Sequence, residues 1–327
     1  MAGKRKMSEI LVFLALLVMA VSGCSGTQSG ETGKKAVNAG SKEPEQEEGG
    51  TEQSADGNEE ADGHTDDSQE AADASKDAQV KEQTLVDQDG IKITLMSLET
   101  GFLGPELKLL IENGTDQGLT VQTRDSSVNG IMTETLFSCD VAAGKSANDG
   151  ITFMNSELEK AQISVLQNFE LSFHIFNSKT WDTVLDTDTV MISTSLDGSE
   201  EQALDDSGVL LLDQDGVRLT VKEADSESSF WGADIYIYVE NNTEKNITVQ
   251  ASGVSINGFM VEPYFSCDVA SGKKSYDSIT FLESELEENH IQSIDNMELS
   301  FRVFESNSFD TIFETEPLKV EFEKTEE

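Results

Sequence analysis

Basic residues are scarce in this sequence. The 327 residues include 63 acidic side chains and only 22 basic ones, giving a formal net charge of −41. Proteins that bind nucleic acid neutralise phosphates with basic patches, so the charge predicts no nucleic-acid partner. An anionic membrane surface should also repel the chain. So large a negative charge is typical of a soluble protein whose copies repel one another.

Cysteine is nearly absent, and its placement excludes a disulfide framework. The three cysteines are Cys24, Cys139 and Cys267. In the segment Phe137–Val141 the odd-numbered residues are apolar, so Cys139 shares the inward face and should act as a small buried side chain. Two inward thiols in separate modules cannot meet. No Gly-x-Ser-x-Gly, His-Glu-x-x-His or phosphate-loop pattern occurs either. The sequence therefore predicts no catalytic residue, no cofactor and no enzymatic activity.

A long apolar run occurs only near the start of the chain. Ile10–Val21 is twelve residues long, too short to span a bilayer comfortably, and Lys4-Arg5-Lys6 precedes it. The run ends in Val21-Ser22-Gly23-Cys24, which resembles a bacterial lipobox. We expect residues 1–23 to be a signal peptide, with Cys24 accepting a diacylglyceryl group. Two acyl chains make a stable anchor, so the predicted location is the extracytoplasmic face of the cell membrane.

Residues 24–82 lack the side chains that build a core. Beyond Cys24 the segment has no Phe, Trp, Tyr, Leu, Ile or Met, and it carries 16 acidic and 5 basic residues. Such a segment cannot bury enough apolar surface to offset the entropy lost on ordering. The sequence predicts a disordered acidic linker.

The remainder of the chain contains one module twice. Ser127–Phe153 returns as Ser255–Phe281, with 17 of 27 positions identical at a spacing of 128 residues. The repeat predicts a first module at 83–196, a linker at 197–207 and a second module at 208–323. Each is of common domain size and large enough to bury a core without disulfides or metals.

The pattern within each module is that of β-strands and tight turns. Phe169–Ile175 alternates apolar and polar residues, as half-buried antiparallel strands do. Asp89-Gly90 and Asn129-Gly130 are typical hairpin turn pairs. One short helical turn, capped by Ser156 with Glu159, is expected. About eight strands per module predict an all-β fold of two tandem immunoglobulin-like antiparallel β-sandwiches. Helical patterns that would indicate a parallel α/β fold are missing.

Three weaker site hypotheses remain open. Asp182, Asp186 and Asp188 could surround a cation at one end of the first sandwich, or could simply lie on a solvated strand face. The pattern Asp87-Gln-Asp89-Gly90 looks faintly like a calcium loop, but flanking strands favour a hairpin turn. Four aromatic residues could form a surface patch, because alternation with Ile235 and Ile237 places the two tyrosines outward: Trp181, Trp231, Tyr236 and Tyr238.

The lipobox, the linker and the module together resemble a family of Gram-positive surface lipoproteins. That family carries tandem immunoglobulin-like domains of unknown function, similar in architecture to a secreted mycobacterial immunoprotective antigen. The resemblance covers roughly residues 83–323 and is carried by Asn113, Ser127–Gly130, Val141–Lys145, Ile151–Leu158 and their counterparts. It implies the fold and the location, and it transfers no catalytic or ligand residue.

These features lead to one hypothesis and two alternatives. We expect a monomeric, lipid-anchored protein that presents two non-catalytic modules to a protein or a cell-wall polymer. The first alternative is a receptor for a cation or a small ligand, suggested by the carboxylate excess. The second is an accessory subunit of a membrane transport or secretion complex.

Overall fold

A computed structural model describes residues 77–199, 202, 204–229 and 232–322, all within one compact unit spanning Gly63–Glu327. The predicted signal peptide, Cys24 and most of the acidic linker lie outside the described residues. Within the described ranges, no helix has the length and apolarity needed to cross a membrane.

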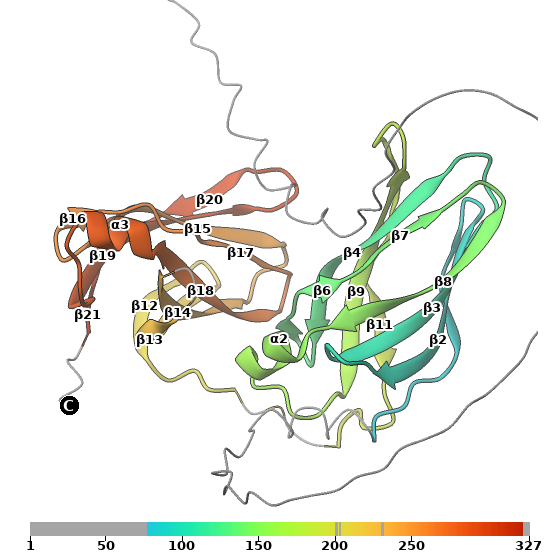
Figure 1. Cartoon of the computed structure of the whole chain (residues 1–327), viewed down its shortest axis with the longest axis horizontal. Helices are drawn as coiled ribbons and strands as arrows, with labels where there is room; N and C mark the ends of the chain where they lie inside the picture. The colour runs from blue at the N-terminus through green and yellow to red at the C-terminus, as the bar shows by residue number, and fades with distance from the viewer. Residues whose placement is uncertain (1–76, 200–201, 203, 230–231, 323–327) are drawn as a thin grey trace, which may run out of the picture. The chain divides into compact units, whose positions relative to one another are not determined.

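The fold is all-β and consists of two tandem immunoglobulin-like sandwiches (Figure 1). The strands of the first module are β1 Gln83–Gln88, β2 Ile91–Thr100, β3 Pro105–Asn113, β4 Leu119–Val128, β5 Ile131–Met132, β6 Thr135–Leu136, β7 Ser138–Val141, β8 Lys145–Phe153, β9 Asn168–Asn177, β10 Thr183–Asp186 and β11 Val190–Ser193, and its helix is α2 Asn155–Lys160.

The second module repeats this order. Its strands are β12 Val209–Gln214, β13 Val217–Ser229, β14 Gly232–Asn241, β15 Ile247–Ile256, β16 Phe259–Met260, β17 Ser266–Val269, β18 Lys274–Leu282, β19 Asn296–Glu305, β20 Thr311–Glu314 and β21 Leu318–Glu321, and its helix is α3 Glu283–Glu288. Several strands have only two to four residues, so each module has more and shorter strands than the predicted eight.

The strands form three sheets. The first has the order β1-β2-β3-β8-β6 and belongs to the first module, and the third has the order β16-β15-β19-β20 and belongs to the second. The middle sheet, β10-β9-β4-β5-β18-β14-β13-β12, contains strands of both modules. Its two halves meet where β5 pairs with β18 in parallel, whereas the neighbouring strand pairs are antiparallel. The modules therefore share a sheet.

Each module has its own apolar core, built by the alternation seen in the sequence. Along β3, Leu107, Leu109 and Ile111 are buried while the residues between them are half-exposed. Phe169 and Phe173 of β9 fill the same core, the Phe169 ring lies 4.8 Å from that of Phe153, and β9 pairs with β4. Burying a side chain of this size stabilises the fold by roughly 1.5–3 kcal/mol. The predicted inward faces of both strands are confirmed.

The predicted hairpin turns are also confirmed. Asp89 and Gly90 have φ of 52° and 80°, and Asn129 and Gly130 have the same pair of values. Positive φ at both central residues is the geometry that matches the twist of antiparallel strands. Strands flank Asp87–Gly90 on both sides, as the hairpin interpretation requires.

The predicted helix cap is wrong. Ser156 lies inside α2, which Met154 precedes as the capping residue without any side-chain hydrogen bond. Instead, the backbone N–H of Asn155 donates to the Leu103 carbonyl at 2.8 Å. The start of α2 is therefore held by the loop before β3. The local sequence pattern could not show this contact, because the loop is distant in the sequence.

The first module also begins earlier than expected. Ala78 is buried in the first core, and the N–H of Gln79 donates to Ser195 Oγ at 3.1 Å. The last residues assigned to the acidic linker therefore pack on the module, beside the end of its final strand.

One buried asparagine ties the two sheets together in each module. Asn113, at the end of β3, donates from Nδ2 to the carbonyls of Gln117 at 2.8 Å and Val141 at 2.9 Å. Its Oδ1 accepts from the N–H of Thr115 at 2.9 Å. Asn241 makes the equivalent bonds to Lys245 and Val269. A short amide side chain thus satisfies backbone groups that would otherwise be buried without partners.

We predict that Asn113→Ala lowers the free energy of unfolding by about 2–4 kcal/mol, because it leaves several buried backbone groups unpaired. Gln88→Ala is the control, since Gln88 is exposed and bonds only its neighbour Asp89; we expect less than about 0.5 kcal/mol there. Urea titration of both variants measures the difference. Equal midpoints would show that the asparagine does not hold the sheets together.

Candidate functional site

The lipid attachment site predicted at Cys24, with Val21, Ser22 and Gly23, lies outside the described residues. The structure therefore adds no geometry to it, and it stays a prediction from the sequence.

The three aspartates proposed as cation ligands do not come together. Asp182, Asp186 and Asp188 are all exposed. The Asp186 carboxylate lies 2.5 Å from His174 Nδ1 and 3.9 Å from Arg124 Nη1. Across the part of the chain that the structure describes, no three His, Cys, Asp or Glu side chains are grouped to hold a metal ion. The solvated strand face is the interpretation that fits.

The predicted aromatic surface patch is wrong in one member, because Tyr238 is buried. Tyr238 is 1% exposed, and its ring centroid lies 4.8 Å from that of Tyr276 on β18. Burial raises the pKa of its hydroxyl, and Glu240 adds to the effect. Trp181 is 70% exposed, Tyr236 is half-buried, and Trp231 lies outside the described residues. The four side chains therefore do not form one exposed patch.

The linker between the modules explains why Tyr238 is covered. Tyr276 Oη donates to the carbonyl of Asp205 at 2.9 Å, and Lys222 Nζ donates to the same carbonyl at 2.8 Å. Hydrogen bonds from Ser207 and Lys222 lower the pKa of the Asp205 carboxyl to about 2. Alternation correctly placed Tyr238 opposite the core of its own module, but it could not show that the linker crosses that opposite face.

An exposed aromatic residue recurs at the same place in both modules, and the sequence patterns predicted Trp181 as exposed but not its counterpart Phe309. Trp181 and its counterpart Phe309 have positive φ, 65° and 61°, which is rare for bulky side chains. Each stacks on a buried neighbour, at 5.5 Å between Trp181 and Phe176 and at 6.0 Å between Phe309 and Phe304. The spacing of 128 residues was the signal that could have found this pair.

The two equivalent thiols are buried and free, as predicted. Burial raises the pKa of the Cys139 thiol to about 12, and Asp149 adds to the shift. Burial also raises the pKa of the Cys267 thiol well above its usual range. Because the thiolate is the nucleophile, neither cysteine is reactive at neutral pH in the folded protein.

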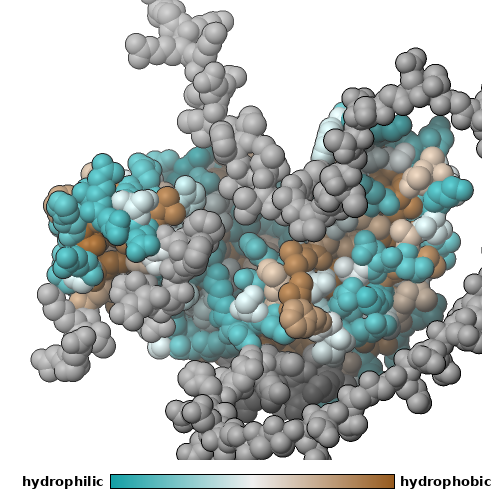
Figure 2. Space-filling model, in the orientation of Figure 1, coloured by the Kyte–Doolittle hydropathy of each residue, from teal (hydrophilic) through white to brown (hydrophobic). Residues whose placement is uncertain are grey.

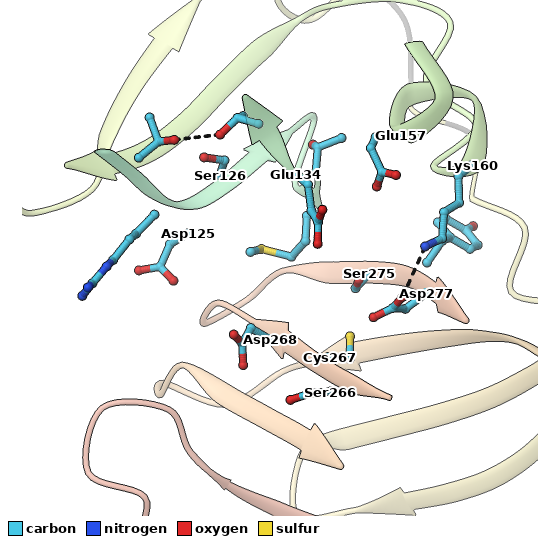
Figure 3. A pocket seen from close by; sticks show the side chains of 16 residues that line it. Asp125, Ser126, Glu134, Glu157, Lys160, Ser266, Cys267, Asp268, Ser275 and Asp277 are labelled. Carbon is cyan, nitrogen blue, oxygen red and sulfur yellow. Dashed lines mark hydrogen bonds and ion pairs between the residues drawn. The ribbon is translucent and has the colours of Figure 1, made fainter. Parts of the chain in front are cut away.

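A strongly charged cavity of about 320 Å³ lies at the junction of the modules. Residues around β4, β5 and β6, together with α2, line one side, and β17 and β18 line the other (Figure 3). Five carboxylates and two cationic side chains face it: Asp125, Glu134, Glu157, Asp268, Asp277, Arg124 and Lys160. No single stretch of sequence contains this set, so the cavity was not predicted.

Polar contacts across the junction hold its two sides together. Lys160 Nζ of α2 lies 3.2 Å from Asp277 Oδ1 of β18. Lys273 forms an ion pair with Glu170 of β9, and both side chains are largely buried. Asn246 Nδ2 donates to Asp125 Oδ2 at 3.2 Å. Partly buried pairs of this kind are screened by salt less than surface pairs are.

Two of the five carboxyls in the cavity, those of Asp125 and Glu157, have raised pKa values. Burial raises the pKa of Asp125, and Asp268 adds to the effect. Burial also raises the pKa of Glu157, partly opposed by Lys160. Burial lowers the pKa of Lys160, but Asp277 and Glu157 outweigh it and the net direction is upward. The cavity thus combines ion-paired charges, hydroxyls and an unreactive thiol, an arrangement suited to holding modules together.

We predict that Glu157→Gln raises the unfolding midpoint at neutral pH. The folded pKa of this carboxyl lies above its unfolded value, so its contribution to stability is present when it is protonated and is lost as the pH rises through the folded pKa. At about pH 3.5 the carboxyl is protonated in both the folded and the unfolded state, so the unfolding midpoint of the variant should equal that of the wild type. Glu159→Gln, an exposed position in the same helix, is the control. An equal gain for both variants, or a gain that persists in acid, would contradict the assignment.

Comparison with known proteins does not assign a family. No protein-family model matches the chain, and no curated protein matches it. Among solved structures, the YadV chaperone is similar at 9% identity over 66% of this chain and 92% of that chain, with a TM-score of 0.23. The Salmonella enterica SafA pilin in complex with the SafB chaperone is similar at 11% identity over 66% of this chain and 89% of that chain, with a TM-score of 0.18. TM-scores this low support no argument about function.

Proposed function

We propose that this protein is a membrane-anchored extracytoplasmic lipoprotein that presents two non-catalytic immunoglobulin-like modules for contact with a protein or a cell-wall polymer. The observation that carries the proposal is the segment Val21-Ser22-Gly23-Cys24 directly after a basic start and a twelve-residue apolar run. On this proposal Cys24 carries the lipid, and the acidic segment that follows holds the modules away from the membrane.

Three properties of the described residues support a binding role without catalysis. The side chains shared by the two modules are mainly core and turn residues. The shared thiols are buried, and burial raises the pKa of both. His174 has Arg302 as its counterpart, so a histidine base common to both modules is missing. We further propose that the chain is related to the Gram-positive lipoproteins that its sequence resembles.

Hydrophilic side chains dominate the visible face of the molecule (Figure 2). The net charge of the chain is −41, which favours solubility of the protein and repulsion from anionic membrane lipids. Attachment to a membrane would therefore depend on the acyl chains and not on the modules, which agrees with the proposed role of Cys24.

We predict that cells expressing the chain incorporate radiolabelled palmitate into it, and that Cys24→Ala abolishes the label and releases the protein from the membrane fraction. Two acyl chains provide the anchoring energy, so the loss should be complete. Cys139→Ala is the matched control and should keep the label, since that thiol is buried. A wild-type chain that never acquires the label would overturn the proposed anchor.

The absence of catalysis is tested separately. The purified chain is incubated with cell-wall fragments, peptides and ester substrates, and we expect no turnover above the buffer rate. Turnover that a single substitution removes would show that the modules are enzymatic.

A further inference from the structure

One surface of the module is covered in the first copy and bare in the second. In the first module, β5 has β18 as its outer neighbour, with Ile131 opposite Lys274, and the N–H of Lys274 donates to the Gly130 carbonyl at 3.2 Å. Ile131 is fully buried, and Met132 packs against the core of the second module. The β4–β5 hairpin is thus an edge that receives a strand.

The second module has the same edge without a neighbour. β16 pairs with β15 in the register that β5 uses with β4, displaced by 128 residues. Among the described strands, however, β16 ends its sheet. Phe259 is 50% exposed and Met260 is 67% exposed, whereas their counterparts Ile131 and Met132 are covered. A bare apolar edge of this kind favours pairing with another strand.

The strand that would fill such an edge is also present and free. In the second module Lys273–Asp277 is covered at the junction, and Ser275 is buried. The counterpart in the first module is Lys145–Asp149 of β8, where all residues but the half-buried Ala147 are exposed. Over this stretch β8 pairs with β3 on one side, while β6 reaches only Thr152 and Phe153 on the other. Among the described residues, the chain therefore has one receiving edge, at β16, and one donor strand, at β8, without a strand partner.

We propose that the β16 edge is a docking surface for β8 of a second copy of this chain, which gives a head-to-tail association that repeats the junction within the chain. Phe259 would lie opposite Ser146, as Ile131 lies opposite Lys274. Lys145 would approach Glu298, as Lys273 pairs with Glu170. This contact is heterologous, since different surfaces of the two copies meet, so further copies can add to either end.

Three differences make this contact weaker than the internal junction. Tyr276 packs against the first core at the internal junction, and its counterpart in β8 is the polar Asn148, so this apolar contact is lost. Asp149 would face Glu288, whereas the internal junction pairs Asp277 with Lys160. Glu298 already has Lys319 as a partner at 3.0 Å, so Lys145 would have to share it. Together with the net charge of −41, these features predict an association that strengthens as salt screens the repulsion.

Disulfide trapping tests the pairing directly. The chain from Ser25 onward, which retains every described residue, is prepared as Phe259→Cys and as Ser146→Cys, and the two are mixed under mild oxidation. Neighbouring strands bring such positions within disulfide range. At about 0.5 M salt, where charges are screened, we expect at least about a fivefold excess of the mixed dimer over a control mixture of Phe259→Cys and Thr84→Cys. Thr84 is an exposed residue on β1, which β2 and β3 separate from β8 in its sheet.

A charge substitution tests the alignment. Glu288→Lys places an opposite charge near Asp149 and should raise the yield of the mixed dimer about threefold or more at low salt, where pair interactions are strong. Glu287→Lys makes the same change in net charge at the neighbouring exposed position and should raise it less.

The possible outcomes divide clearly. A mixed dimer in excess, with a larger gain from Glu288→Lys, supports head-to-tail docking. Equal yields from the Ser146 and Thr84 mixtures, a predominance of Phe259→Cys homodimers, or equal gains from the two lysine substitutions would overturn it. The test needs no lipid, so it can fail while the proposed anchor stands.

Discussion

The burial of alternating apolar side chains is the constraint on which this structure depends. Every long strand places one face against a core, and the two sheets of each module close over that core. Burying one large apolar side chain stabilises the fold by roughly 1.5–3 kcal/mol, which is far more than a surface ion pair contributes. Turns, buried asparagines and short helices then adjust how the strands enter and leave the core. The charge of the surface contributes solubility and little to the fold.

The same constraint explains the junction between the modules. Ile131 and Met132 lie on β5 of a hairpin, where β18 pairs with Ile131 and Met132 packs against the core of the second module. The ion pairs Lys160–Asp277 and Lys273–Glu170 fix the alignment of the two modules, which apolar packing alone does not specify. Because the module is duplicated, the second copy has the same hairpin, but none of the described strands covers its outer side. Phe259 and Met260 are the visible result.

The sequence predicted the elements of the fold well and the assembled surfaces poorly. The repeat, the inward faces of β3 and β9, the glycine turns and the buried cysteines follow from local patterns, which depend on periods of two residues and on positive φ. The burial of Tyr238, the entry of α2 and the packing of Ala78 each depend on a segment distant in the sequence. The junction cavity was missed for the same reason, since Glu157 and Asp277 are brought together only by the pairing of two modules. Comparison of the two copies, residue by residue, was the signal that the sequence offered.

Amide hydrogen exchange tests the central claim, that the hairpin edge of the first module receives β18, while the equivalent stretch Lys145–Asp149 of β8 has no strand partner on that side among the described strands. The amide of Lys274 donates to the Gly130 carbonyl, and Ser146 is its counterpart on the uncovered strand. In dilute solution at low salt the account predicts strong protection at Lys274 and rapid exchange at Ser146. Equal exchange rates at the two amides would contradict it, because the two edges would then be equally open.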